Sequence, residues 1–257
     1  MFSRYLSLRI IYYSFGALLI AGSAFFTANY PNLMLLDLFA VLVIVLLLIG
    51  VLTVIAFKMF NKEVMSCLLN CHVREYMDKL DKRMKTARAP AMKSSYADYS
   101  ALGYIMLGDY DSAFDCCQKI TTDVNRPNYY RYMVEYYLNR GLMDQAEKTL
   151  CDYKAFAIAC KKKSVVKLCN RHMKDVEYAV NVRKGIFDGA EEYYRKRLND
   201  EEVKKVLISK VSFSYSLGKL LLIKGDKVQS KEYLQFAFDN AGDTKYRALS
   251  GQLLSEI

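Results

Sequence analysis

The pattern of hydrophobic and polar positions divides the chain near residue 57. Before that point, residues 10–28 and 38–57 form two apolar runs without a charged side chain. An α-helix rises about 1.5 Å per residue, so each run is long enough to cross a hydrocarbon core of roughly 30 Å. We therefore predict a membrane anchor over residues 1–57, with transmembrane helices at about 10–28 and 38–57.

The first apolar run has an alternative interpretation. A short basic start followed by an apolar stretch also describes a cleavable signal peptide, and Ala21–Ala24 resembles a weak cleavage site. However, the run is long for a signal-peptide core, and a second apolar run follows at once. These two features favour an anchor that is not cleaved.

The positions of the cations predict the orientation of the anchor. Arg4 and Arg9 precede the first run, and Lys58 and Lys62 follow the second, whereas the connecting loop at 29–32 has no cation. The positive-inside rule then places both termini in the cytoplasm. We expect an integral protein of a bacterial plasma membrane, with an organelle membrane as the alternative. Neither run contains an ionisable residue, which argues against a pore or a pump.

Residues 58–93 are predicted to form a juxtamembrane stalk and a linker. From Lys58 to about Arg88 there is no helix breaker, and apolar residues recur at three- and four-residue steps. This pattern predicts a stalk helix that continues out of the second span. Pro90 is expected to end that helix, because the residue before a proline resists the helical conformation. Residues 92–95 are then expected to be a linker.

Residues 94–257 contain four segments with one plan: an amphipathic helix, a turn at a glycine, and a second helix with a small residue five positions after the glycine. The glycines are Gly108, Gly141, Gly185 and Gly225, and the small residues are Ala113, Ala146, Ala190 and Ser230. Glycine adopts the left-handed conformation that closes a helix. The small residue allows the returning helix to lie close to the first. Such hairpins cannot bury an apolar face alone, so stacked copies are expected.

These segments resemble the tetratricopeptide repeat. The stretches Gly108–Phe114 and Gly141–Glu147 look like the central turn of that family. The turn glycines are 33, 44 and 40 residues apart, whereas the family period is about 34 residues, so longer helices must absorb the difference. The resemblance implies an all-α protein in which residues 94–257 form an α-solenoid of about four hairpins. Residues 244–257 are expected to form a capping helix.

The charge of the chain lies almost entirely outside the anchor. Of the net charge of +10, +9 belongs to residues 58–257. This balance favours anionic lipid or an acidic protein as a partner. We do not predict nucleic-acid binding, because the many tyrosines mostly occupy positions expected to be buried. The strongest basic patch consists of Lys161, Lys162, Lys163, Lys167 and Arg171. It is either a solvated turn between helices or a contact for anionic lipid or an acidic partner.

Seven cysteines and two histidines raise the question of a metal site. Cys67, Cys71 and His72 lie together in the predicted stalk, and Cys169 and His172 share one helix face. A tetrahedral zinc site needs four ligands with defined spacing, and the chain has no Cys-x2-Cys pair. Buried cysteine also behaves as a small core residue. Because no known catalytic or phosphate-binding motif is present, we predict no catalytic residue, no metal and no cofactor.

The resemblance also implies a face that binds a partner protein, lined by the first helix of each hairpin. In this sequence the predicted face consists of Arg131, Glu135, Asn139, Arg183, Tyr215 and Lys219. The family's chaperone-binding clamp uses Lys and Asn, but Asp98 and Leu102 stand at those positions in the first hairpin. A site for a chaperone tail is therefore not expected.

Three functions remain in order of preference. The first is a non-enzymatic scaffold that recruits a cytoplasmic protein to the membrane through its helical repeats. The second is an accessory subunit of a membrane transporter or other membrane complex, in which the two spans make the main contacts. The third is a metal-dependent enzyme that uses cysteine and histidine.

Overall fold

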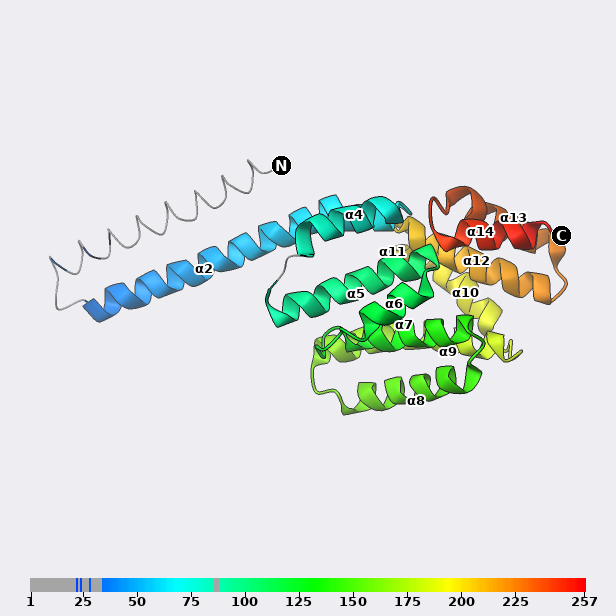
Figure 1. Cartoon of the computed structure of the whole chain (residues 1–257), viewed down its shortest axis with the longest axis horizontal. Helices are drawn as coiled ribbons and strands as arrows, with labels where there is room; N and C mark the ends of the chain where they lie inside the picture. Colours follow the sequence, from blue (N-terminus) through cyan, green and yellow to red (C-terminus); the bar gives the residue numbers. More distant parts are fainter. Residues whose placement is uncertain (1–21, 23, 25–27, 29–33, 86–87) are drawn as a thin grey trace. The chain divides into compact units, whose positions relative to one another are not determined.

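A computed structural model describes residues 22, 24, 28, 34–85 and 88–257 (Figure 1). The described residues form helices and turns, with no β-strand among them, which confirms the prediction of an all-α protein. The chain divides into two units, residues 1–61 and 62–257. The first predicted span, 10–28, lies almost entirely outside the described residues.

The first unit contains α2 (Met34–Phe60), which includes the second predicted span. In the described part of the chain, one helical stretch is long and apolar enough to cross a membrane. It runs from Ala40 to Leu69 and reaches a mean hydropathy of 3.3. Large aliphatic side chains of α2, such as Leu46 and Leu47, are exposed. This is the length and composition that a lipid-facing helix needs.

After α2 the chain stays helical only as far as Leu69. It passes through a π-helical turn, η2 (Asn61–Met65), and the short α3 (Ser66–Leu69), and it turns again before α4 (Val73–Met84). At this second turn Cys71 has a φ of 63°, in the left-handed region. The predicted continuous stalk helix is therefore wrong, because α3 and α4 pack against other helices of the second unit.

Asp243, near the other end of the chain, stabilises this turn. Its carboxylate accepts hydrogen bonds from the N–H groups of Val73 at 2.6 Å and Arg74 at 2.9 Å, which caps the N-terminus of α4. The Asp243 N–H donates to the Cys71 carbonyl at 3.1 Å. A Cβ on the neighbouring Gly242 would clash with that carbonyl oxygen. Tertiary contacts 170 positions apart thus interrupt the predicted stalk.

Pro90 begins a helix instead of ending one. α5 (Pro90–Leu107) has the proline in its first turn, where the missing N–H is not needed and the fixed φ suits a helix. The predicted linker at 92–95 is wrong for this reason, since these residues are helical. Ser94 is buried in α5, and its Oγ accepts hydrogen bonds from the N–H groups of Thr121 and Thr122 at 3.1 and 3.2 Å.

Each of the four predicted glycines lies between two consecutive helices, and their φ angles lie between 71° and 87°. The pairs are α5 with α6 (Tyr110–Cys117), α7 (Arg126–Asn139) with α8 (Met143–Ala159), α9 (Lys163–Arg183) with α10 (Ala190–Asn199), and α12 (Leu207–Ile223) with α13 (Lys227–Asn240). The small residues five positions after each glycine are at most 1% exposed. Both the turns and the buried small positions are therefore confirmed.

The third pair departs from the other three. A second left-handed glycine, Gly189, lies in the loop before α10, and α10 packs mainly against α12. Contact with α9 is kept by Tyr178 and Tyr193, whose rings stack with centroids 4.3 Å apart. The short α11 (Glu201–Lys204) leads to α12. The last helix, α14 (Lys245–Leu254), packs on α12 and α13. It lies within residues 244–257, where a capping helix was predicted.

Candidate partner-binding face

The structure places the six predicted partner-binding residues on α7, α9 and α12. Arg131, Glu135 and Asn139 belong to α7, Arg183 to α9, and Tyr215 and Lys219 to α12. Arg183 links two of these helices, because its Nη2 donates to the Leu138 carbonyl of α7 at 3.4 Å. We call these six residues the α7–α9–α12 face.

Lys245, the first residue of α14, contacts this face from within the same chain. Its Nζ forms an ion pair with Glu135 and donates a hydrogen bond to the Tyr110 hydroxyl at 3.1 Å. The Lys245 side chain is only 8% exposed. Burial alone would lower the pKa of Lys245, but Glu135, Tyr246 and Tyr110 together outweigh burial and hold the pKa above its usual value. Glu135 is therefore paired internally.

Tyr246, the next residue of α14, contacts the face at a second point. Its ring lies against the Tyr215 ring with centroids 5.4 Å apart, and its hydroxyl is 2.8 Å from the Ser212 Oγ. Burial raises the pKa of Tyr215 to about 12. The start of α14 thus covers Glu135 and Tyr215 but leaves Asn139 exposed.

Arg183 and Lys219 are the two cations of the face that carry no carboxylate partner among the described residues. Burial lowers the pKa of Lys219, and the charge of Arg183 lowers it further. Two like charges that repel each other, one of them half-buried, are unfavourable without an anion. This part of the face is therefore suited to a carboxylate from outside the chain.

Arg131 lies among acidic side chains, of which Asp98 is buried. Arg131 interacts electrostatically with Glu135, Asp98 and Asp175. Burial raises the pKa of Asp98 to about 6, against the opposing effects of Asn128 and Arg131. The Asn128 amide donates to one oxygen of Asp98 at 3.0 Å, while the other oxygen has no hydrogen-bond partner in the described structure. Arg131 is therefore part of the interior as much as of the surface.

The cysteine and histidine residues form no metal-binding group in the described part of the chain. Burial, together with nearby Arg131, Arg171 and Arg197, lowers the pKa of His172 to about 3, so its ring is neutral at pH 7. Burial also raises the pKa of Cys169. A neutral imidazole is the form that ligates a metal, but in the described residues no group of three or more potential ligands includes Cys169 and His172.

The residues of the second cysteine and histidine group, in the predicted stalk, differ in exposure. Cys67 and Cys71 are buried, whereas His72 is exposed. Burial and the nearby Asp243 raise the pKa of Cys71 to about 11. Cys67 lies 3.2 Å from the Nζ of Lys79. These cysteines therefore act as core residues at the turn before α4.

The predicted basic patch separates into two parts. Lys161, Lys162 and Lys163 are exposed at the α8–α9 turn, and Lys167 and Arg171 lie further along α9. Lys162 is 3.4 Å from Asp123, and Arg171 is 3.2 Å from Glu202. The described residues offer no ion pair to Lys161, Lys163 or Lys167.

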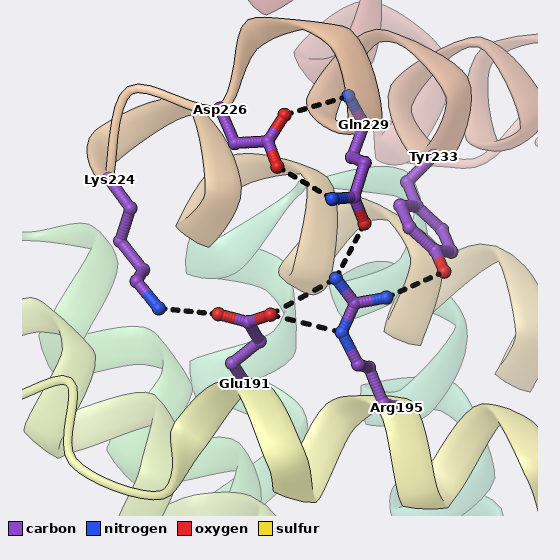
Figure 2. A network of polar contacts seen from close by, with 6 residues as sticks. All are labelled: Glu191, Arg195, Lys224, Asp226, Gln229 and Tyr233. Carbon is purple, nitrogen blue, oxygen red and sulfur yellow. Dashed lines mark hydrogen bonds and ion pairs between the residues drawn. The ribbon is translucent and has the colours of Figure 1, made fainter.

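An open depression of about 820 Å³ lies along α10. Three of its charged lining residues, Glu191, Arg195 and Lys224, belong to a network here called the Glu191 clasp, which is completed by Asp226, Gln229 and Tyr233 (Figure 2). Glu191 pairs with both Lys224 and Arg195. Arg195 also donates to Gln229 at 2.7 Å and to Tyr233 at 3.3 Å. Because these charges satisfy one another, the clasp joins α10 to the α12–α13 turn and is a structural feature.

Sequence reasoning did not find Lys245, Tyr110, Tyr246 or Asp243. Lys245 and Glu135 are 110 positions apart, and no sequence pattern connects them. Only the tertiary fold brings them together. Comparisons with protein-family models, with curated proteins and with solved structures each found no match.

Proposed function

We propose that this chain is a membrane-anchored scaffold that holds a protein partner on its α7–α9–α12 face. In this proposal, spans at 10–28 and 38–57 anchor the chain, with both termini in the cytoplasm. The helical pairs form a tetratricopeptide-like solenoid. The proposal makes the chain a binding protein without catalytic residues or a cofactor.

The observation that carries this proposal is the pair of cations, Arg183 and Lys219, on a face built from separate parts of the chain. They come from α9 and α12, and neither is matched by a carboxylate in the described structure. A stable fold normally pairs charges that it partly buries. An acidic segment of a partner would supply the missing anion, and exposed Asn139 would supply an amide beside it.

Site-specific cross-linking tests the proposal. A photoreactive amino acid at Asn139, which is exposed, is placed in the full chain expressed in its membrane. We expect a discrete cross-linked partner that disappears in the double variant Arg183→Glu, Lys219→Glu. The matched control is Lys227→Glu, Lys231→Glu, which changes two exposed lysines of α13 by the same charge. An identical cross-link in both double variants would contradict the proposal.

The exposed aliphatic surface of α2 favours a second candidate, an accessory subunit of a transporter or other membrane complex. Such side chains pack equally well against lipid or against the helices of another membrane protein. Deletion of residues 94–257 distinguishes the two functions. A complex that survives this deletion but not deletion of residues 1–57 supports the subunit, and the opposite result supports the scaffold.

A further inference from the structure

One end of the helical pairs carries a concentration of positive charge. We call it the basic end and define it as residues 88–93, 118–126 and 158–163. It contains seven cationic residues and one acidic residue, Asp123. The cations are Arg88, Lys93, Lys119, Arg126, Lys161, Lys162 and Lys163.

Hydrogen bonds and an ion pair join the three segments of the basic end. Ser94, one residue after the first segment, accepts hydrogen bonds from the N–H groups of Thr121 and Thr122 in the second segment. Asp123 of the same loop lies 3.4 Å from Lys162 at the α8–α9 turn. Segments that are distant in sequence therefore form one surface, at the side of the second unit where α5 begins and α8 ends (Figure 1).

Each segment of the basic end also exposes a large apolar side chain. Met92 is 47% exposed, Val124 57% and Ile158 87%. An isolated exposed aliphatic residue is ordinary in a folded protein. Three of them among lysines on one surface form the combination found in interfacial membrane-binding segments, where cations attract anionic lipids and apolar groups insert beneath the headgroups.

The opposite end provides an internal control. We call it the turn end and define it as residues 107–111, 139–144, 183–192 and 223–228. It exposes aliphatic residues to a comparable degree, including Val228 at 75%. However, it contains five cationic and seven acidic residues. Charge, and not apolar exposure, therefore distinguishes the two ends.

We propose that the basic end docks on the surface of an anionic lipid bilayer. Charge complementarity favours this partner, because the basic end has few internal anions to neutralise its lysines. The covalent connection to α2 keeps the second unit beside the membrane that α2 crosses. The inference thus rests on the proposed membrane anchor and is independent of any protein partner.

The size of the expected effect follows from the charges. Each lysine near an anionic surface changes the docking equilibrium by about fivefold at moderate salt. Replacing Lys161, Lys162 and Lys163 by glutamine should therefore reduce docking roughly a hundredfold. Salt of about 1 M shortens the screening length to roughly 3 Å and should weaken docking in the same direction.

The chain contains no tryptophan, which allows a direct test. Full-length Ile158→Trp is reconstituted in vesicles of phosphatidylcholine, with or without phosphatidylserine, in which part of the phosphatidylcholine carries brominated acyl chains. We expect the emission of the tryptophan to shift to shorter wavelength and to be quenched when phosphatidylserine is present. Full-length Val228→Trp, at the turn end, is the matched control and should show neither change.

Two triple variants in the Ile158→Trp background complete the test. Lys161→Gln, Lys162→Gln, Lys163→Gln should abolish the quenching. Lys196→Gln, Lys227→Gln, Lys231→Gln removes the same charge from exposed lysines elsewhere and should preserve it. Three results would overturn the inference: no quenching of the tryptophan at 158, equal quenching at 158 and 228, or an emission change that requires added single-stranded RNA instead of phosphatidylserine.

Flotation of the same vesicles after alkaline carbonate extraction separates failure of the docking from failure of the anchor. Chains that float but show no quenching at 158 reject the docking and retain the anchor. Chains that carbonate releases from the vesicles reject the anchor, and the docking inference with it.

Discussion

The basic end and the turn end of the second unit expose similar aliphatic side chains but use their charges differently. At the turn end, ion pairs link Arg140 to Asp111 and Lys224 to Glu191. At the basic end, only Lys162 has an ion-pair partner in the described structure. A cation that already forms an ion pair within the chain gains little further free energy from binding an outside anion. Exposure alone therefore does not distinguish the two ends, whereas exposure combined with an excess of unpaired cations does.

The largest expected effect is the transfer of docking to the other end. Asp144→Lys, Asp188→Lys, Glu192→Lys makes the turn end positive, and these three exposed carboxylates take part in no described ion pair. In the Val228→Trp background, quenching by brominated lipid should appear in anionic vesicles, with docking strengthened roughly a hundredfold. Persistent absence of quenching would show that charge does not decide which end docks. The matched amide variants, Asp144→Asn, Asp188→Asn, Glu192→Gln, should give a smaller gain.

A second prediction compares the packing of the two ends. Ala190 is fully buried where α10 approaches α12, so Ala190→Leu should overpack this contact and destabilise the fold by about 2 kcal/mol. Ala159, in the last turn of α8 at the basic end, is exposed, and Ala159→Leu should change stability by less than about 0.5 kcal/mol. Thermal unfolding in detergent, followed by circular dichroism, measures both. An equal loss of stability in the two variants would contradict the tight packing described for Ala190.

The burial of Ala190, which its spacing from Gly185 predicted, shows which parts of the fold can be predicted from the sequence. The left-handed glycines and the small residues after them follow from local geometry, so they were predicted correctly from spacing alone. Pro90 was misread because a proline suits the first turn of a helix as well as the end of one. The break at Cys71 was missed because it contains neither glycine nor proline and depends on Asp243.

The candidate face was predictable only in part. The resemblance to a helical repeat selected residues on α7, α9 and α12, and their helix positions place them on the first helices of the pairs. It gave no indication that Lys245 pairs with Glu135 or that Tyr246 covers Tyr215. These contacts depend on where the last helix packs, and local sequence spacing does not predict that position.

A third prediction uses pH to weaken the turn end. Lys224 and Arg195 lower the pKa of Glu191 below its usual value of 4.5. The clasp should therefore stabilise the fold above the unfolded-state pKa and lose this contribution as pH falls through the lower pKa of the folded state. Glu191→Gln should lower the free energy of unfolding by about 1 kcal/mol at pH 7. The stability of this variant should also fall less at acid pH than that of the unchanged chain.

Hydrogen exchange at neutral and acid pH measures this effect locally. Acid should reduce protection of amides around the Glu191 clasp in the unchanged chain, while the basic end keeps its protection. Equal acid sensitivity of the unchanged chain and the Glu191→Gln variant would show that the clasp does not stabilise the turn end.

The smallest expected effect concerns the pair of Lys162 and Asp123. Both side chains are about 60% exposed, so water screens the pair. Lys162→Gln should lower the free energy of unfolding by less than about 0.5 kcal/mol. A loss above about 1 kcal/mol in urea unfolding would mean that this lysine serves the fold instead of an outside anion.

The comparison of the two ends has functional meaning only if residues 62–257 lie at the cytoplasmic leaflet, where anionic lipids are concentrated. Protease treatment of sealed membrane vesicles of both orientations determines on which side of the membrane these residues lie. We expect residues 62–257 to be cut in inside-out vesicles and protected in right-side-out vesicles. Cleavage of this region in right-side-out vesicles, with none in inside-out vesicles, would contradict it.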